Sequence, residues 1–143
     1  MVKRYINESG SGWVKTIVDP VGENQIHVSV LAGVEVIAAI TRRRCEGSLD
    51  ATAAAAAINE FQDDFEFLYQ HVAVNEGVVQ RAMLLAQRHG LRGYDAVQLA
   101  AGTILNDRSQ AAGVSFLFVS ADAALNAAAA VEGLQVENPN LHV

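Results

Sequence analysis

The stretch Phe116-Leu117-Phe118-Val119-Ser120-Ala121-Asp122 decides the fold class, because an apolar run ends in a hydroxyl residue and an acid. A short apolar run followed by a helix-capping residue predicts a strand at 116–119 and a helix that begins after Ser120 and continues to Val131. Gly133 ends this helix, and residues 134–136 predict a further short strand. Short apolar strands that alternate with helices are typical of a parallel sheet covered on both faces.

The same alternation extends toward the N-terminus. Two further short strands are predicted at 25–28 and 71–74. The helices are predicted up to Asn7 and at 13–18, 30–44, 48–69, 75–89 and 94–107, with Ser11, Ser29 and Asn75 as N-caps and Gly90 as a helix end. We therefore expect a three-layer α/β/α fold with a central parallel sheet, in which residues 1–143 form a single domain.

Composition limits the classes of function. The chain has 143 residues, a formal charge of −6, and one cysteine, Cys45. The single cysteine excludes an intrachain disulfide framework and favours the cytoplasm. No signal peptide is recognisable, and Glu35 interrupts the longest apolar stretch, so no membrane span is expected. The negative charge argues against a non-specific nucleic-acid coat, but it is compatible with acids gathered around metal ions.

Three acids are the candidate metal ligands. Glu35 lies in the apolar stretch 31–40, where a buried carboxylate needs either a metal or a salt bridge to an arginine. Asp95 lies in the first turn of a largely apolar helix, and Asp122 follows a strand at a helix N-terminus. Each of the last two also has a simpler interpretation, as a carboxylate that stabilises the helix dipole. Together the three predict an oxygen-ligand site for Mg²⁺ or Mn²⁺.

The order and spacing of several motifs resemble one family. The motifs are Val2-Lys3-Arg4-Tyr5, Glu8, Gly10-Ser11, Trp13-Val14, Ser29 to Glu35, Leu91 to Ala96 with Leu99-Ala100, and Phe118 to Asp122. They resemble the PIN-domain ribonucleases, and among these the VapC toxins of type II toxin–antitoxin systems. The resemblance implies a metal-dependent endoribonuclease with Glu35, Asp95 and Asp122 as metal-coordinating acids and Ser120 as the accompanying hydroxyl. It also implies an RNA substrate, a cognate antitoxin and a homodimer.

One part of the family pattern has no counterpart in the chain. Members of the family open with a central strand that ends in an Asp, a few positions before the segment that corresponds to Val2-Lys3-Arg4-Tyr5. We therefore expect the first acid and the first strand to be missing, the neighbouring strand edges to be open, and cleavage by these residues alone to be slow or absent. The alternative is a PIN-like protein that binds an antitoxin or RNA without cutting. A phosphatase-like hydrolase ranks behind both, because no strand-end Asp nucleophile is present.

The remaining charged residues have two interpretations. Arg42-Arg43-Arg44 ends a helix, where cations favour the dipole, but with Lys3, Arg4 and Arg92 it could also form a phosphate-facing rim. Glu60, Asp63, Asp64 and Glu66 are interpreted as a solvated helix face. The four histidines share no ligand spacing, so a zinc site is not expected, and Cys45 is interpreted as an inert thiol.

Overall fold

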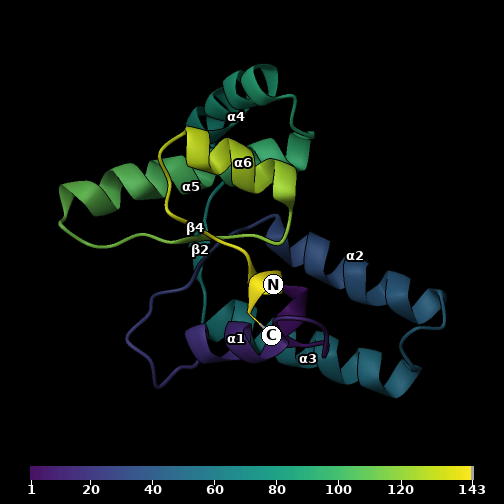
Figure 1. The fold of residues 1–143 in the computed structure, drawn as a ribbon. Helices are drawn as coiled ribbons and strands as arrows, with labels where there is room; N and C mark the ends of the chain where they lie inside the picture. The colour runs from purple at the N-terminus through teal and green to yellow at the C-terminus, as the bar shows by residue number, and fades with distance from the viewer. Residues whose placement is uncertain (143) are drawn as a thin grey trace. The chain divides into compact units, whose positions relative to one another are not determined.

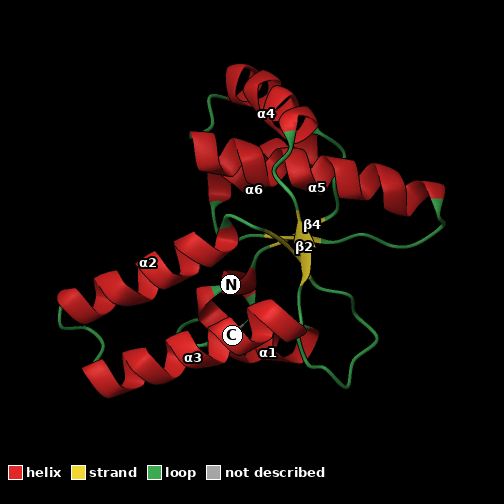
Figure 2. Cartoon of the chain, turned by 180° about the vertical axis from the view of Figure 1, so that it is seen from behind, coloured by secondary structure: helices red, strands yellow, loops and turns green. Residues whose placement is uncertain are grey.

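The computed structural model describes residues 1–142 and divides the chain into two compact units. Unit 1 comprises residues 1–72 together with His142, and unit 2 comprises residues 73–141. Both units mix helices with short parallel strands, and helices account for most of the ordered residues (Figures 1 and 2). The mixed α/β class predicted from the sequence is confirmed. Within residues 1–142, no helix combines the length and the apolar character needed to cross a membrane.

Unit 1 is built around one pair of parallel strands and three helices. Its elements are η1 (Val2–Arg4), α1 (Ser11–Ile17), β1 (His27–Ser29), α2 (Ala32–Cys45), α3 (Ala51–Phe67) and β2 (Gln70–Val72). β1 pairs with β2 in the register His27 with Gln70 through Ser29 with Val72. Phe61 of α3 and Ile40 of α2 are almost completely buried and form the centre of the core. The imidazole of His142 stacks on Trp13 at 4.1 Å, so this residue near the C-terminus packs against α1.

A polar network fixes the N-terminal segment on α3. The carboxylate of Asp64 accepts a hydrogen bond from Arg4 Nε at 2.6 Å and one from the Tyr5 hydroxyl at 2.9 Å. The Tyr5 hydroxyl also contacts the hydroxyl of Tyr69, which is buried. Burial raises the pKa of Tyr69 to about 12, so its hydroxyl stays protonated at neutral pH. Asp64 therefore pairs with Arg4 and Tyr5 in a half-buried position, and the prediction that it belongs to a solvated helix face was wrong. Asp63 beside it is exposed.

Unit 2 consists of three helices and a second pair of parallel strands. Its elements are α4 (Glu76–His89), α5 (Gly93–Ala111), β3 (Phe118–Val119), α6 (Ala123–Val131), β4 (Val136–Glu137) and η2 (Pro139–Leu141). β3 pairs with β4, with Phe118 opposite Val136. The ring of Phe118 lies against Gly102 of α5, where an added Cβ would come within 2.8 Å of the ring. The close approach of strand and helix thus requires a glycine at this position.

Helix ends were predicted with mixed success. Asn75 caps α4 by accepting a hydrogen bond from the Val78 amide, and Gly90 ends it with a φ of 66°, so both predictions are confirmed. The predicted serine caps were wrong at all three sites. Gly10 precedes α1, Leu31 precedes α2, and Asp122 caps α6. The hydroxyls of Ser29 and Ser120 instead accept hydrogen bonds from amides two residues later, which closes a turn before the helix begins.

The predicted central sheet is only partly reproduced. The structure contains two separate two-stranded sheets, β1–β2 and β3–β4, and both pairs are parallel as expected. Across residues 1–142, no strand has hydrogen-bonded neighbours on both sides. The observed hydrogen bonds connect the strands only in pairs. A single three-layer sheet that contains all four strands therefore stays a prediction.

An ion-pair cluster links α4 to the end of α6. Glu132 Oε1 lies 2.7 Å from an Arg88 guanidinium nitrogen and 2.6 Å from His89 Nε2. The hydrogen bond from His89, supported by Arg88, holds the pKa of Glu132 below its ordinary value. A carboxylate with a depressed pKa stabilises the folded state at pH values above its ordinary pKa, and this contribution disappears as the pH falls through the folded-state pKa.

Replacing Asp64 by Ala should destabilise unit 1 by about 2 kcal/mol, because Arg4 and Tyr5 both lose their acceptor in a half-buried environment. The measurement is urea unfolding monitored by circular dichroism. Asp63→Ala is the matched control and should change the stability by less than about 0.5 kcal/mol. Equal losses in the two variants would contradict the role given to the network.

Replacing Glu132 by Gln should lower the stability by about 1 kcal/mol or less at neutral pH and should have a smaller effect as the pH falls below the ordinary glutamate pKa. Unfolding curves between pH 3 and pH 7 measure the difference between the variant and the wild type. Glu76→Gln removes an exposed acid of α4 and serves as the control. A stability difference that does not vary with pH would rule out the ion pair as its source.

Candidate functional site

The turn Ser120-Ala121-Asp122 connects the end of β3 to the start of α6. The Asp122 amide donates to Ser120 Oγ at 3.1 Å, and Asp122 Oδ1 accepts from the Leu125 amide at 2.8 Å. The Ser120 amide donates to the carbonyl of Glu137, which follows Val136 in β4. These bonds place a hydroxyl and an exposed carboxylate just beyond the carboxyl end of a parallel strand pair, the place where open α/β sheets bind ligands.

Asn126 is a part of this turn that the sequence did not single out. Its Nδ2 donates to the Ser120 carbonyl at 2.8 Å, across six residues of sequence. Its Oδ1 is buried and has no hydrogen-bond partner among residues 1–142. An asparagine near the start of a helix is not a sequence signal for this hydrogen bond to the Ser120 carbonyl. The bond forms only because the turn before α6 brings that carbonyl close to the helix. Asn126 therefore holds the backbone of the turn from the helix side.

Asp95 lies in the first turn of α5. Arg92, the residue before the helix, is its N-cap. Its backbone is extended, and its side chain makes no capping hydrogen bond. Asp95 is half-buried, whereas Ala96 beside it is completely buried in the core of unit 2. Near the N-terminus of a helix, a carboxylate is stabilised by the helix dipole. The first turn of α5 thus presents a partly shielded acid.

Glu35 lies in the first turn of α2, and the expectation that it is buried was wrong. The buried positions of α2 are Ala32, Val36 and Ile40, which follow one face of the helix. Glu35 lies outside this buried face and is exposed, next to Val34, which is 70% exposed. The apolar residues that flank Glu35 in the sequence therefore did not mean that every face of α2 is buried. Burial therefore no longer supports a metal-binding role for Glu35, and only the resemblance does.

The three acids are distributed over the two units. Glu35 belongs to unit 1, whereas Asp95 and Asp122 belong to unit 2. Within the part of the chain that the structure describes, no group of three or more His, Cys, Asp or Glu side chains is arranged to hold a metal ion. The convergence of the three acids is therefore a prediction, and each unit by itself supplies at most two of the residues.

The basic residues near the N-terminus are mostly engaged in ion pairs. Arg43 and Lys3 both contact the carboxylate of Glu8, at 2.6 and 3.2 Å. Burial alone would raise the pKa of Glu8, but the hydrogen bonds from Arg43 and Lys3 hold it below its ordinary value. Since Arg4 pairs with Asp64, the expected phosphate-facing rim loses three members in unit 1. Arg42, Arg44 and Arg92 are exposed.

Changing Asp122 to Asn should leave the stability of unit 2 nearly unchanged, because the amide oxygen can still accept from the Leu125 amide. Changing it to Ala should cost about 1 kcal/mol. Chemical denaturation of both variants measures the difference, and the same pair of substitutions at Asp50, which caps α3 in the same way, provides the reference. If the Asn variant unfolds as readily as the Ala variant, the carboxylate charge matters more than the cap.

In unit 2 the turn after β3 carries a hydroxyl and a carboxylate, and α5 carries a second acid. The third acid belongs to α2 of unit 1 and is exposed. No family model matches the chain, and a search of curated proteins gives no significant match.

Proposed function

We propose that the protein is a cytoplasmic, metal-dependent endoribonuclease resembling the VapC toxins of the PIN-domain family. The observation that carries the proposal is the turn Ser120-Ala121-Asp122, which lies beyond the carboxyl end of a parallel strand pair and leads into α6. A hydroxyl and a carboxylate in this place are the elements that the resemblance assigns to the site. Asp95, half-buried in the first turn of α5, supports the same assignment.

In this proposal Glu35, Asp95 and Asp122 hold Mg²⁺ or Mn²⁺, whose oxygen-ligand preference suits carboxylates. Such an ion, when bound, activates water and stabilises charge during phosphodiester displacement. The protein's own contribution is positional. The bonds of Asn126 and Glu137 to the backbone of Ser120 fix the turn, and the cap from Asp122 to Leu125 orients its carboxylate. The proposed partners are an RNA substrate and a cognate antitoxin. The same proposal includes a homodimer and a single three-layer α/β/α sheet.

The number of acids limits the expected activity. The resemblance implies a fourth acid at the end of a strand, and residues 1–143 supply three candidates. An ion held by fewer fixed ligands binds more weakly and places its water less accurately, so cleavage by these residues alone should be slow. A version extended ahead of Val2 by a strand that ends in Asp should cleave faster.

The alternative is a PIN-like protein that binds an antitoxin or RNA without cutting. In this alternative the three candidate acids do not converge on a metal ion, and the turn Ser120-Ala121-Asp122 serves only to begin α6. The alternative predicts that the site tolerates loss of its acids without any effect on the affinity for the partner.

The decisive experiment compares RNA cleavage by the chain and by the extended version, using a mixed RNA pool with Mg²⁺ or Mn²⁺ and with EDTA. We expect metal-dependent cleavage that Asp95→Asn lowers by more than about a hundredfold, because a ligand to the reacting centre is lost. Asp107→Asn, an exposed acid farther along α5, should cleave like the wild type.

Two results would overturn parts of the proposal. Equal cleavage by the Asp95→Asn and Asp107→Asn variants would remove Asp95 from the site. Absence of cleavage by the extended version across varied RNAs, in the presence of either metal ion, would favour the binding protein instead.

A further inference from the structure

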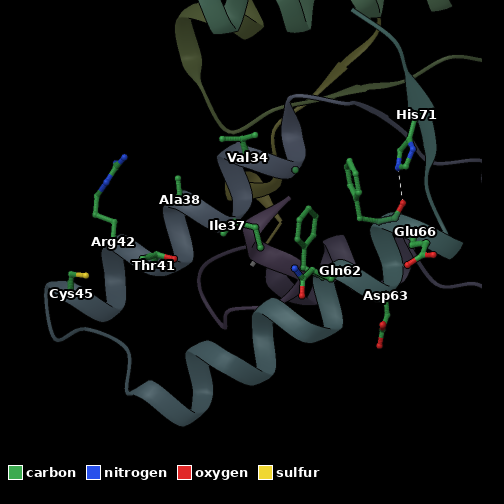
Figure 3. A pocket seen from close by; sticks show the side chains of 13 residues that line it. Val34, Ile37, Ala38, Thr41, Arg42, Cys45, Gln62, Asp63, Glu66 and His71 are labelled. Carbon is green, nitrogen blue, oxygen red and sulfur yellow. Dashed lines mark hydrogen bonds between the residues drawn. The ribbon is translucent and has the colours of Figure 1, made fainter.

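Polar side chains of this chain generally reach either a hydrogen-bond partner or solvent. The open groove between α2 and α3 of unit 1 shows both cases (Figure 3). There His71 Nε2 lies 2.6 Å from the carbonyl oxygen of Phe65, a contact drawn as a dashed line. The side chains of Asp63 and Glu66, by contrast, are exposed. Oδ1 of Asn126 in unit 2 is the exception, because it is the one buried side-chain oxygen or nitrogen that has no partner in the described part of the chain.

The unpartnered oxygen lowers the stability of unit 2, because the Asn126 amide gives up hydrogen bonds to water when the unit folds. An asparagine side chain can donate two hydrogen bonds and accept two. Within the described residues, Asn126 makes one side-chain hydrogen bond to the protein, from Nδ2 to the Ser120 carbonyl at 2.8 Å. Stability alone would therefore favour an apolar side chain of similar size, such as leucine.

The surroundings of Asn126 lead to the same conclusion. Leu125 before it and Ala129 three residues after it are almost completely buried in the core of unit 2. Asn126 is half-buried beside them, on the border between this core and the surface of α6. A polar side chain on such a border can normally satisfy its polar atoms with water. Asn126 instead directs its amide back along the helix, toward the turn that precedes α6.

Three hydrogen bonds connect Ser120 to different parts of unit 2. Its amide donates to the carbonyl of Glu137 in β4, and its Oγ accepts from the Asp122 amide at 3.1 Å. The third bond runs from Asn126 to the Ser120 carbonyl, and of the three only this one reaches a residue within α6, the helix that Asp122 caps. The Asn126 bond therefore fixes the end of β3 relative to the first turn of α6, where the Asp122 carboxylate lies.

We propose that Asn126 is a positioning residue of the metal site, and that it is retained despite its unpartnered oxygen because its amide aligns the Asp122 carboxylate. The inference rests on the proposed function and adds to it a residue that contacts neither the ion nor the RNA. Two hydrogen bonds connect this residue to the ligand, from Asn126 to the Ser120 carbonyl and from the Asp122 amide to Ser120 Oγ. Loss of a group that orients a metal ligand weakens metal binding by about tenfold to a hundredfold.

The test uses the whole chain and removes the amide of Asn126 in two ways. Asn126→Leu replaces it by an apolar side chain of similar size, and Asn126→Ala replaces it by a smaller one that fits even if leucine does not. Asn106→Leu changes a half-buried asparagine of α5 and is the matched control. Urea unfolding measures the stability, and hydrogen exchange of the Asp122 amide measures the order of the turn. Broadening of the same amide signal by Mn²⁺ measures metal binding at the site.

We expect Asn126→Leu to unfold at the urea concentration of the wild type or above it, since the unpartnered oxygen is gone. The Asp122 amide should nevertheless exchange faster, because the turn before α6 loses a hydrogen bond. The Mn²⁺ concentration that half-broadens the Asp122 signal should rise by about tenfold or more in both Asn126 variants. Asn106→Leu should leave exchange and Mn²⁺ binding at Asp122 as in the wild type. A purely structural asparagine would give the opposite combination, a lower stability with unchanged metal binding.

Either of two outcomes would refute the positioning role. One is Mn²⁺ binding at Asp122 that Asn126→Leu and Asn126→Ala leave unchanged. The other is a loss of binding that Asn106→Leu shares, because the loss would then come from a general change in unit 2. Absence of broadening at Asp122 in the wild type would instead remove the metal site of the proposed function, and the positioning role with it, so the two failures are distinguishable.

Discussion

Parallel strands of two or three residues form too few hydrogen bonds to persist in water, so each unit depends on helices that pack against its strand pair. In unit 2 the dependence is visible at one contact, where Phe118 of β3 lies on Gly102 of α5. In unit 1 the helices α2 and α3 close over the core through Ile40 and Phe61. The positions of the turns that follow the strands are therefore set by helix packing rather than by the strands themselves.

Features controlled by adjacent residues could be predicted from the sequence. Asn75 and Gly90 bound α4 as expected, because an asparagine cap and a left-handed glycine act within one turn of the backbone. Ser120 and Asp122 both have side chains that can cap, and sequence alone favoured the serine. In the structure Ser120 closes the turn and Asp122 caps α6, since only Asp122 lies at the boundary residue.

Features controlled by distant residues could not be predicted. Asp63 and Asp64 are adjacent acids on α3, yet only Asp64 meets Arg4 and Tyr5, which are about 60 positions away in the sequence. Glu35 posed the opposite problem, because its apolar neighbours suggested burial on every side. A continuous apolar pattern shows that a helix can be covered, but it does not show which face is covered within this chain.

A structural role for an acid does not compete with a role in binding. Asp122 uses Oδ1 to cap α6, and a carboxylate has a second oxygen that a cap does not need. The cap fixes the side chain and so reduces the entropy that a ligand would otherwise have to overcome.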